Sequence, residues 1–185
     1  MEGNIDLGKV QALDLNLTAT GTGSIMARAL YANNTNVHTD AGAVTLGAVH
    51  GKAAISSNAG SIKIGTAEGN ITITTKTGSA AVHLNECDSA ECTSSSGSIT
   101  VSMLEDQAAT VLVQEPGTTL HGSVTVLSAE GAGMVTGTTK VSGEGTINGG
   151  GFPLVVGSPE GKVTINTKSW FEASMESAAL LNASQ

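Results

Sequence analysis

The chain has 185 residues, and 24 of them are glycine. Its aromatic residues are one Trp, one Tyr and two Phe. With 16 acidic and 8 basic residues, its net charge is −8. This length favours a single domain over residues 1–185, with a core filled by aliphatic side chains. The acidic balance and the single arginine, Arg28, exclude a basic surface for nucleic acid. No apolar run approaches the roughly 20 residues of a membrane span, and the initial MEGNIDLG lacks the features of a secretory signal, so we expect an intracellular protein.

One five-residue motif recurs along the chain: a glycine followed by apolar residues two and four positions later. It reads GNIDL from Gly3, GAVTL from Gly42 and GSIKI from Gly60. A fixed period of this kind is typical of solenoid proteins rather than of sandwiches or barrels. Successive units start 18 to 20 residues apart, and half-unit glycines fall midway: the starts are Gly3, Gly23, Gly42, Gly60, Gly78 and Gly97, and the half-unit glycines are Gly51 and Gly69.

Apolar residues at alternate positions predict strands that bury one face, and the glycine before each strand would supply the backbone freedom for a corner. Each unit therefore predicts one coil of strand, corner, strand and corner, in which every residue stacks on its equivalent in the next coil. The predicted fold class is all-β: a single-stranded β-helix, or β-solenoid, with about 18–20 residues per coil.

The two apolar positions of the motif predict a core ladder that follows chain order. The position between them points outward, and threonine recurs there. The predicted ladder contains Ile5, Leu7, Ile25, Val44, Leu46, Ile62, Ile64, Ile71, Ile73, Val82, Ile99, Val101, Val124, Val126, Val163 and Ile165. The outward threonines are Thr45, Thr72, Thr100, Thr125 and Thr164.

The pattern divides the chain into three segments. Regular coils are predicted over residues 3–126, with one stretched spacing between Val101 and Gly122, and irregular Gly-rich coils over residues 127–168. A C-terminal helix is predicted over residues 169–183, because the segment from Ser169 to Glu172 fits a capping box, and this helix would cover the last coil. No capping element precedes the first coil, so we expect self-association through that open edge.

Units such as GSIKI, GNITI and GSITV resemble the adhesin-like β-solenoid repeats of a domain family of unknown function. The ending GKVTINTKSWFE, from Gly161 to Glu172, is similar to that of an animal member of the group. The resemblance covers most of residues 3–172 and implies a single-stranded, right-handed β-helix. It brings no catalytic signature, and an adhesin-like role is implied by analogy alone.

Two cysteines and one histidine form the only candidate metal ligands: His83, Cys87 and Cys92. A structural zinc site normally takes four ligands, and this spacing is not a strong zinc pattern. Cys87 stands nine residues after Gly78, where a half-unit glycine is expected, so the favoured interpretation is a modified corner with inert thiols or a disulfide. We therefore predict no metal and no cofactor.

The acidic turn beside these cysteines, with Glu86, Asp88 and Glu91, is the one candidate for catalysis, because carbohydrate-active β-helix enzymes use clustered carboxylates. Three acids in one loop are more typical of a solvated surface. The favoured function is a non-enzymatic repeat scaffold or binding module, adhesin-like, that contacts a protein or a glycan through a lateral face. A carbohydrate-active enzyme is the alternative, and ice binding by the outward threonines is a weaker one.

Overall fold

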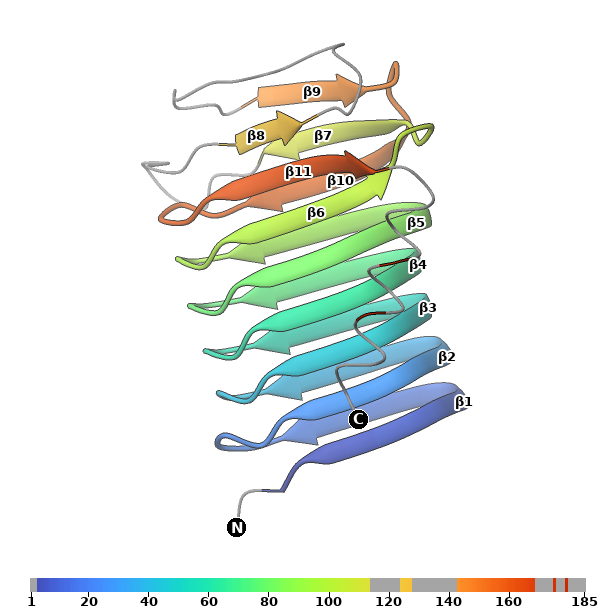
Figure 1. Ribbon diagram of the computed structural model, residues 1–185, viewed down its shortest axis with the longest axis vertical. Coiled ribbons are helices and arrows are strands. Elements are labelled where there is room, and N and C mark those ends of the chain that lie inside the picture. Colours follow the sequence, from blue (N-terminus) through green and yellow to red (C-terminus); the bar gives the residue numbers. More distant parts are fainter. Residues whose placement is uncertain (1–2, 114–123, 128–142, 169–174, 176–178, 180–185) are drawn as a thin grey trace.

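The computed structural model describes residues 3–113, 124–127, 143–168, 175 and 179, and these contain eleven strands in one continuous sheet (Figure 1). The strands are β1 (Ile5–Ala19), β2 (Ile25–Thr39), β3 (Val44–Ser57), β4 (Ile62–Thr75), β5 (Ala80–Ser94), β6 (Ile99–Leu104), β7 (Ala109–Val113), β8 (Val124–Leu127), β9 (Gly143–Ile147), β10 (Phe152–Gly157) and β11 (Val163–Lys168). The all-β solenoid prediction is confirmed.

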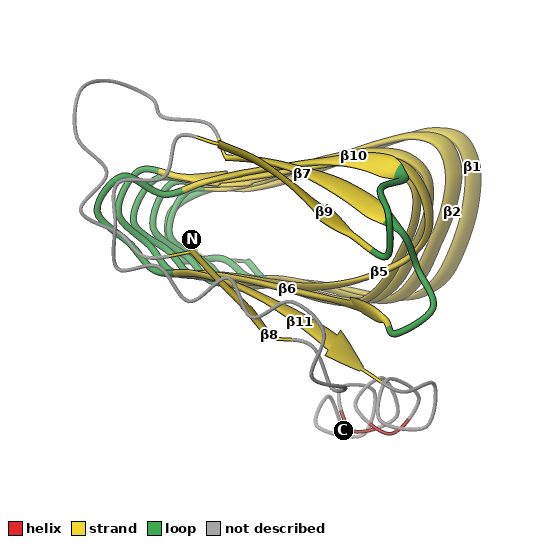
Figure 2. Cartoon of the chain, turned by 90° about the horizontal axis from the view of Figure 1, so that it is seen from above, coloured by secondary structure: helices red, strands yellow, loops and turns green. Residues whose placement is uncertain are grey.

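Each of β1 to β5 makes one regular coil, because the strand bends at its middle and covers both flat sides of the solenoid (Figure 2). We call the side formed by the first half of each strand the first face, and the side formed by the second half the second face. Successive strands run parallel, and equivalent residues lie opposite one another: Ile25 pairs with Val44, and Val44 pairs with Ile62. The offset of 18 or 19 residues is the period of the sequence repeat.

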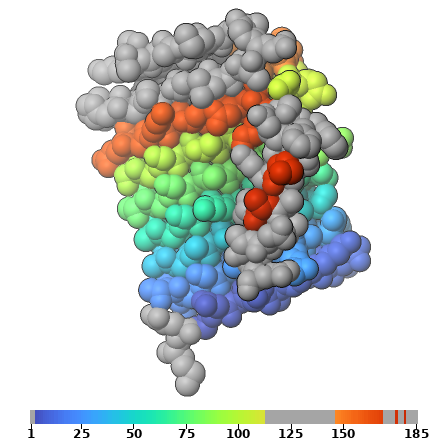
Figure 3. Space-filling view, in the orientation of Figure 1, coloured from blue at the N-terminus to red at the C-terminus, as the bar shows by residue number. Residues whose placement is uncertain are grey.

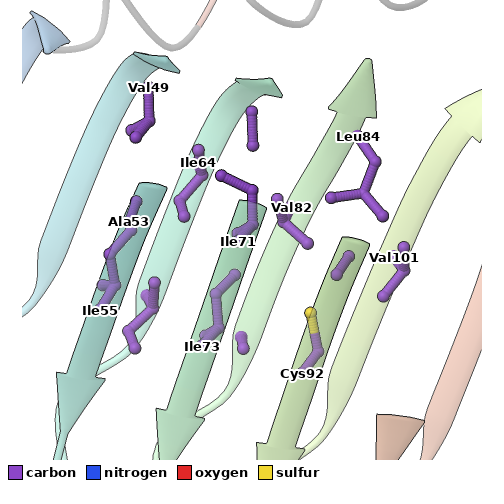
Figure 4. Close-up of a cluster of buried hydrophobic side chains, with 14 of the residues drawn as sticks. Val49, Ala53, Ile55, Ile64, Ile71, Ile73, Val82, Leu84, Cys92 and Val101 are labelled. Atoms are coloured by element: carbon purple, nitrogen blue, oxygen red, sulfur yellow. The ribbon is translucent and has the colours of Figure 1, made fainter. Parts of the chain in front are cut away.

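The core is a narrow column of aliphatic side chains between the two faces. Val44, Ile62 and Ile99 are fully buried, and Figure 4 shows the same stacking for Ile55, Ile73 and Cys92 on the second face. Burying each Val, Leu or Ile contributes roughly 1.5–3 kcal/mol relative to exposure. The first coil differs, because its Ile5 and Leu7 are only partly buried where β1 forms the end of the stack.

The C-terminal strands do not stack in chain order. On the first face β11 lies between β6 and β8, and on the second face β10 lies between β5 and β7. In Figure 3 the orange-red band of the C-terminal strands accordingly lies directly on the green coils. The expected chain-order ladder is therefore wrong at this end: Ile99 pairs with Val163, and Val163 pairs in turn with Val124. Strand β9 adds a further departure, because it runs antiparallel to β7.

Connection lengths explain this order. In the regular coils the second-face residue follows its first-face counterpart by seven or eight positions, as in Leu46 to Ala53 and Val82 to Ala90, whereas Val111 follows Val101 by ten. The longer connection lets the chain climb past one level of the stack, and β10 and β11 then fill the space left behind. The stretched spacing is visible in the sequence, but it does not say which strands occupy the vacated level.

The unit glycines after the first coil are required by close stacking and not by backbone freedom, which corrects the expectation. A Cβ atom on Gly42 would lie 1.8 Å from the carbonyl oxygen of Gly23, and one on Gly60 would lie 1.8 Å from that of Gly42. Neither glycine has a positive φ. The left-handed conformation occurs instead at the half-unit corners, where Gly51 and Gly69 both have φ of 96°.

In four successive turns a buried hydroxyl three residues before the unit glycine is hydrogen-bonded to that glycine, a device that the sequence pattern did not reveal. The Ser57 Oγ accepts a hydrogen bond from the Gly60 N–H at 2.9 Å, and the Ser94 Oγ accepts one from the Gly97 N–H at 2.8 Å. These hydroxyls satisfy backbone groups that the core would otherwise leave unpaired.

The predicted C-terminal helix, residues 169–183, lies almost wholly outside the described residues. Two of its members, Met175 and Ala179, are described, and both are helical and exposed. Within the described part of the chain, the structure contains no helix that is long and apolar enough to cross a membrane.

Candidate functional site

The outer side of the second face is a flat surface formed by β1 to β5, and we call it the amide–hydroxyl face. Three columns of five side chains run along it, and none of the fifteen is buried. Four are asparagine and six are serine or threonine, so the surface is rich in uncharged hydrogen-bonding groups. The columns are Asp14, Asn34, Lys52, Asn70 and Ser89; Asn16, Asn36, Ala54, Thr72 and Glu91; and Thr18, His38, Ser56, Thr74 and Thr93.

Hydrogen bonds between adjacent coils hold several of these side chains in place. The Asn34 Nδ2 donates to the Asp14 Oδ1 at 2.7 Å, and the Ser89 Oγ donates to the Asn70 Oδ1 at 3.1 Å. Because both bonds cross from one coil to the next, they fix rotamers on a backbone that is itself rigid. These four side chains of the first column are therefore preorganised, which lowers the entropy cost of contacting a ligand.

The middle column keeps its polar groups available. Asn16, Asn36 and Thr72 lie exposed in this column and make no side-chain hydrogen bond within the described residues. Asn16 and Asn36 are one strand apart, and Asn36 and Thr72 are two strands apart with Ala54 between them, at a strand spacing of about 4.8 Å. The column can therefore offer hydrogen bonds at multiples of this spacing to an extended ligand.

His38 lies in a serine–histidine–aspartate group that sequence spacing did not reveal, because Ser56 comes from the coil after that of His38 and Asp40. The Ser56 Oγ lies 2.9 Å from the His38 Nδ1, and the Asp40 Oδ1 lies 3.5 Å from the His38 Nε2. The Ser56 hydroxyl also donates to the Val37 carbonyl oxygen at 3.4 Å, so its proton is directed to the backbone. With His38 and Asp40 40% and 45% exposed, the group lacks the shielded base of a hydrolase triad.

A second polar stack follows the corner between the two faces. The Lys9 ammonium lies 4.7 Å from the centre of the Tyr31 ring, and that ring stacks on His50 with 4.3 Å between centroids. The His50 Nδ1 lies 2.7 Å from the Glu68 Oε2, and the Asn85 Nδ2 donates to the Glu68 Oε1 at 2.9 Å. Tyr31 has neighbours on both sides of its ring, so the stack stabilises the corner and offers no aromatic platform.

The candidate metal ligands do not form a metal centre in the described residues, which bring no three His, Cys, Asp or Glu side chains together suitably. Cys87 pairs with Gly69, at the predicted modified corner. Both cysteines are free thiols. Burial raises the pKa of Cys92 to about 12, and burial raises the pKa of Cys87 to about 11 against the opposing hydrogen bond to the Asn85 backbone. His83 is 8% exposed on the first face.

The outward threonines do not share one column. Thr45, Thr100 and Thr164 lie on the first face, whereas Thr72 lies on the amide–hydroxyl face. Thr125 pairs with Thr164 through its backbone, and its side chain is outside the described part. This distribution gives neither face the regular threonine array that would favour ice binding.

The acidic turn is open to solvent. Glu86, Asp88 and Glu91 are all exposed, and Glu86 has a positive φ of 49° beside the modified corner. Glu91 belongs to the amide–hydroxyl face, with its neighbour Thr72 in the preceding coil. The turn has the geometry of a surface corner, and it gives the carboxylates no shielded site of the kind that acid catalysis needs.

Parallel coils, aliphatic ladders and polar outer faces define the protein as a β-solenoid repeat domain. The sequence model of the Toastrack DUF4097 family matches residues 1–166, and the chain belongs to this family. Comparison with the curated proteins and with the solved structures finds no match.

Proposed function

We propose that the protein is a non-enzymatic, adhesin-like scaffold that binds an extended glycan along its amide–hydroxyl face. The observation that carries this proposal is the five-coil array of exposed asparagine, serine and threonine side chains in register on β1 to β5. The resemblance of the repeats to adhesin-like sequences agrees with such a role. A repeat protein commonly uses an extended surface of this kind for binding.

Composition favours a glycan over a protein as the partner. Energetically dominant residues of protein interfaces are enriched in Trp, Tyr and Arg, usually packed in apolar pockets. The amide–hydroxyl face contains none of these, and Ala54 is its one apolar member. Amide and hydroxyl groups instead match the donors and acceptors of sugar hydroxyls, and each such hydrogen bond contributes only about 0.5–1.5 kcal/mol. Useful affinity therefore requires a polymer that contacts several coils.

A glycan array followed by titration calorimetry tests this proposal. The double variant Asn36→Ala with Thr72→Val removes two members of the middle column, and we expect it to weaken glycan binding at least tenfold without changing the melting temperature. Thr45→Val on the first face is the matched control and should bind normally. Equal loss in both variants, or binding only to a protein in a proximity-labelling screen, would contradict the glycan assignment.

We also propose that a second copy of the chain pairs with the open edge of β1. This strand pairs only with β2 among the described strands, its ladder residues Ile5 and Leu7 are partly buried, and Leu13 is 74% exposed. Sedimentation should show concentration-dependent dimers that disappear in Leu7→Lys and persist in the outward control Asp6→Lys. A monomer at all concentrations would contradict this proposal.

A further inference from the structure

The last coil of the chain, β10 and β11, is inserted in the stack between strands that precede it in the sequence. We call residues 152–168 the inserted coil. It has parallel neighbours on both sides, because β10 pairs with β5 and β7 while β11 pairs with β6 and β8. The Ile99 N–H donates to the Lys162 carbonyl oxygen at 2.8 Å, just as the Ile62 N–H donates to that of Ser79 at 2.9 Å in a regular coil.

The position next to β6 is filled by a unit of the regular apolar pattern. Val163 and Ile165 occupy it, and Val124 and Val126 of β8 repeat the same pattern one level further along. If the inserted coil leaves, β8 can pair with β6 in the same register. On the second face, β7 can likewise meet β5, because Val111 and Ala90 both pair with Leu154. The stack can therefore close behind the departing coil.

The entrance to the inserted coil is a turn at residues 148–150, followed by a hydrogen bond from the Thr110 hydroxyl to the Gly151 carbonyl oxygen at 3.5 Å. Asn148, Gly149 and Gly150 all have positive φ, at 52°, 83° and 89°. The Asn148 Nδ2 donates to the carbonyl oxygens of Glu105 and Gln107, both at 2.7 Å. One exposed side chain thus fastens the turn to the connection between β6 and β7.

We propose that the inserted coil is exchangeable between two copies of the protein. In the exchanged dimer, residues 152–168 of each chain occupy the position between β6 and β8 of the other, with the same register as in the monomer. Asn148 acts as the latch that keeps the coil in its own chain. Exchange of an identical element through a hinge is a low-cost route to a dimer, because it makes no new type of contact.

Two single-cysteine chains test the exchange, both built on the Cys87→Ser, Cys92→Ala background. Thr100 and Thr164 are paired neighbours on β6 and β11. Chains carrying Thr100→Cys and Thr164→Cys are mixed, incubated below the melting temperature and oxidised. We expect covalent heterodimers. The control mixture uses Thr45→Cys and Lys63→Cys, which are paired neighbours on β3 and β4 in the regular coils, and should give none.

The latch is tested in the same assay with Asn148→Gly, which tolerates the positive φ but removes the amide. We expect heterodimer formation at least tenfold faster than without this change. Asn58→Ala, which removes the 3.3 Å amide bond to Asp40 in a regular turn, should leave the rate unchanged. The exchange would be overturned if the first mixture gave no heterodimer, or if both mixtures gave equal amounts. The latch would be overturned if the two asparagine variants changed the rate equally.

Discussion

The regular coils β1 to β5 and the rearranged end β6 to β11 contain the same motif but stack by different rules. In the regular coils each strand pairs with the next one along the chain, and most paired residues lie 18 to 20 positions apart. In the rearranged end β11 separates β6 from β8, although all three carry an apolar residue at the equivalent backbone position: Val101, Ile165 and Val126. The motif therefore decides which side chains point inward, while the connections decide which strands become neighbours.

Placing a charge in the core should give the largest difference in unfolding free energy between the two regions. Ile62 and Ile165 are both fully buried, in a regular coil and in the inserted coil. We expect Ile62→Asp to cost about 4 kcal/mol or more of unfolding free energy, because an unpaired carboxylate is left in an apolar stack. Ile165→Asp should cost less if the inserted coil can leave. Urea denaturation measures both, with exposed Lys63→Asp as the control at roughly 0.5 kcal/mol or less.

Replacing a unit glycine by alanine should lower the unfolding free energy by an intermediate amount. This loss should be similar in both regions. A Cβ atom on Gly60 would meet the Gly42 oxygen at 1.8 Å, and one on Gly161 would meet the Gly97 oxygen at 2.2 Å. Alanine at either position should cost about 1–3 kcal/mol by overpacking. Gly8→Ala has nothing within 4 Å and should change stability little. A neutral Gly161→Ala would show that the inserted coil does not stack as the regular coils do.

Thiol titration probes the regular coils alone, because both cysteines lie on β5. Burial raises the pKa of Cys87 to about 11 and that of Cys92 to about 12, from 9.0. The thiols' contribution to stability is thus complete below pH 9 and falls as the pH rises through the folded-state values. Melting temperatures from pH 8 to 10.5 should fall more steeply for the wild type than for Cys87→Ser with Cys92→Ala. Parallel curves would contradict the burial of these thiols.

The repeat alone predicts the coils, because alternation specifies side-chain direction and a constant period specifies the neighbour. Ile62 and Val44, for example, need no further information to be placed in one column. The inserted coil could not be predicted, since Val124 and Val163 are equally good partners for Ile99 by pattern. The amide–hydroxyl face was foreseen only as a polar lateral face, because its grouping of Asn36 with Thr72 depends on which half of each strand lies on which side.

Disulfide mapping tests the stacking account most directly. Two double variants on the Cys87→Ser, Cys92→Ala background carry cysteines at Thr100 with Thr164, and at Thr100 with Thr125. Neighbouring strands lie about 4.8 Å apart, and disulfides need Cα atoms within about 7 Å. Brief oxidation should therefore close the first pair, since Thr164 pairs with both other threonines, and leave the second open. Rapid closure of the Thr100–Thr125 pair alone would show chain-order stacking and contradict the account.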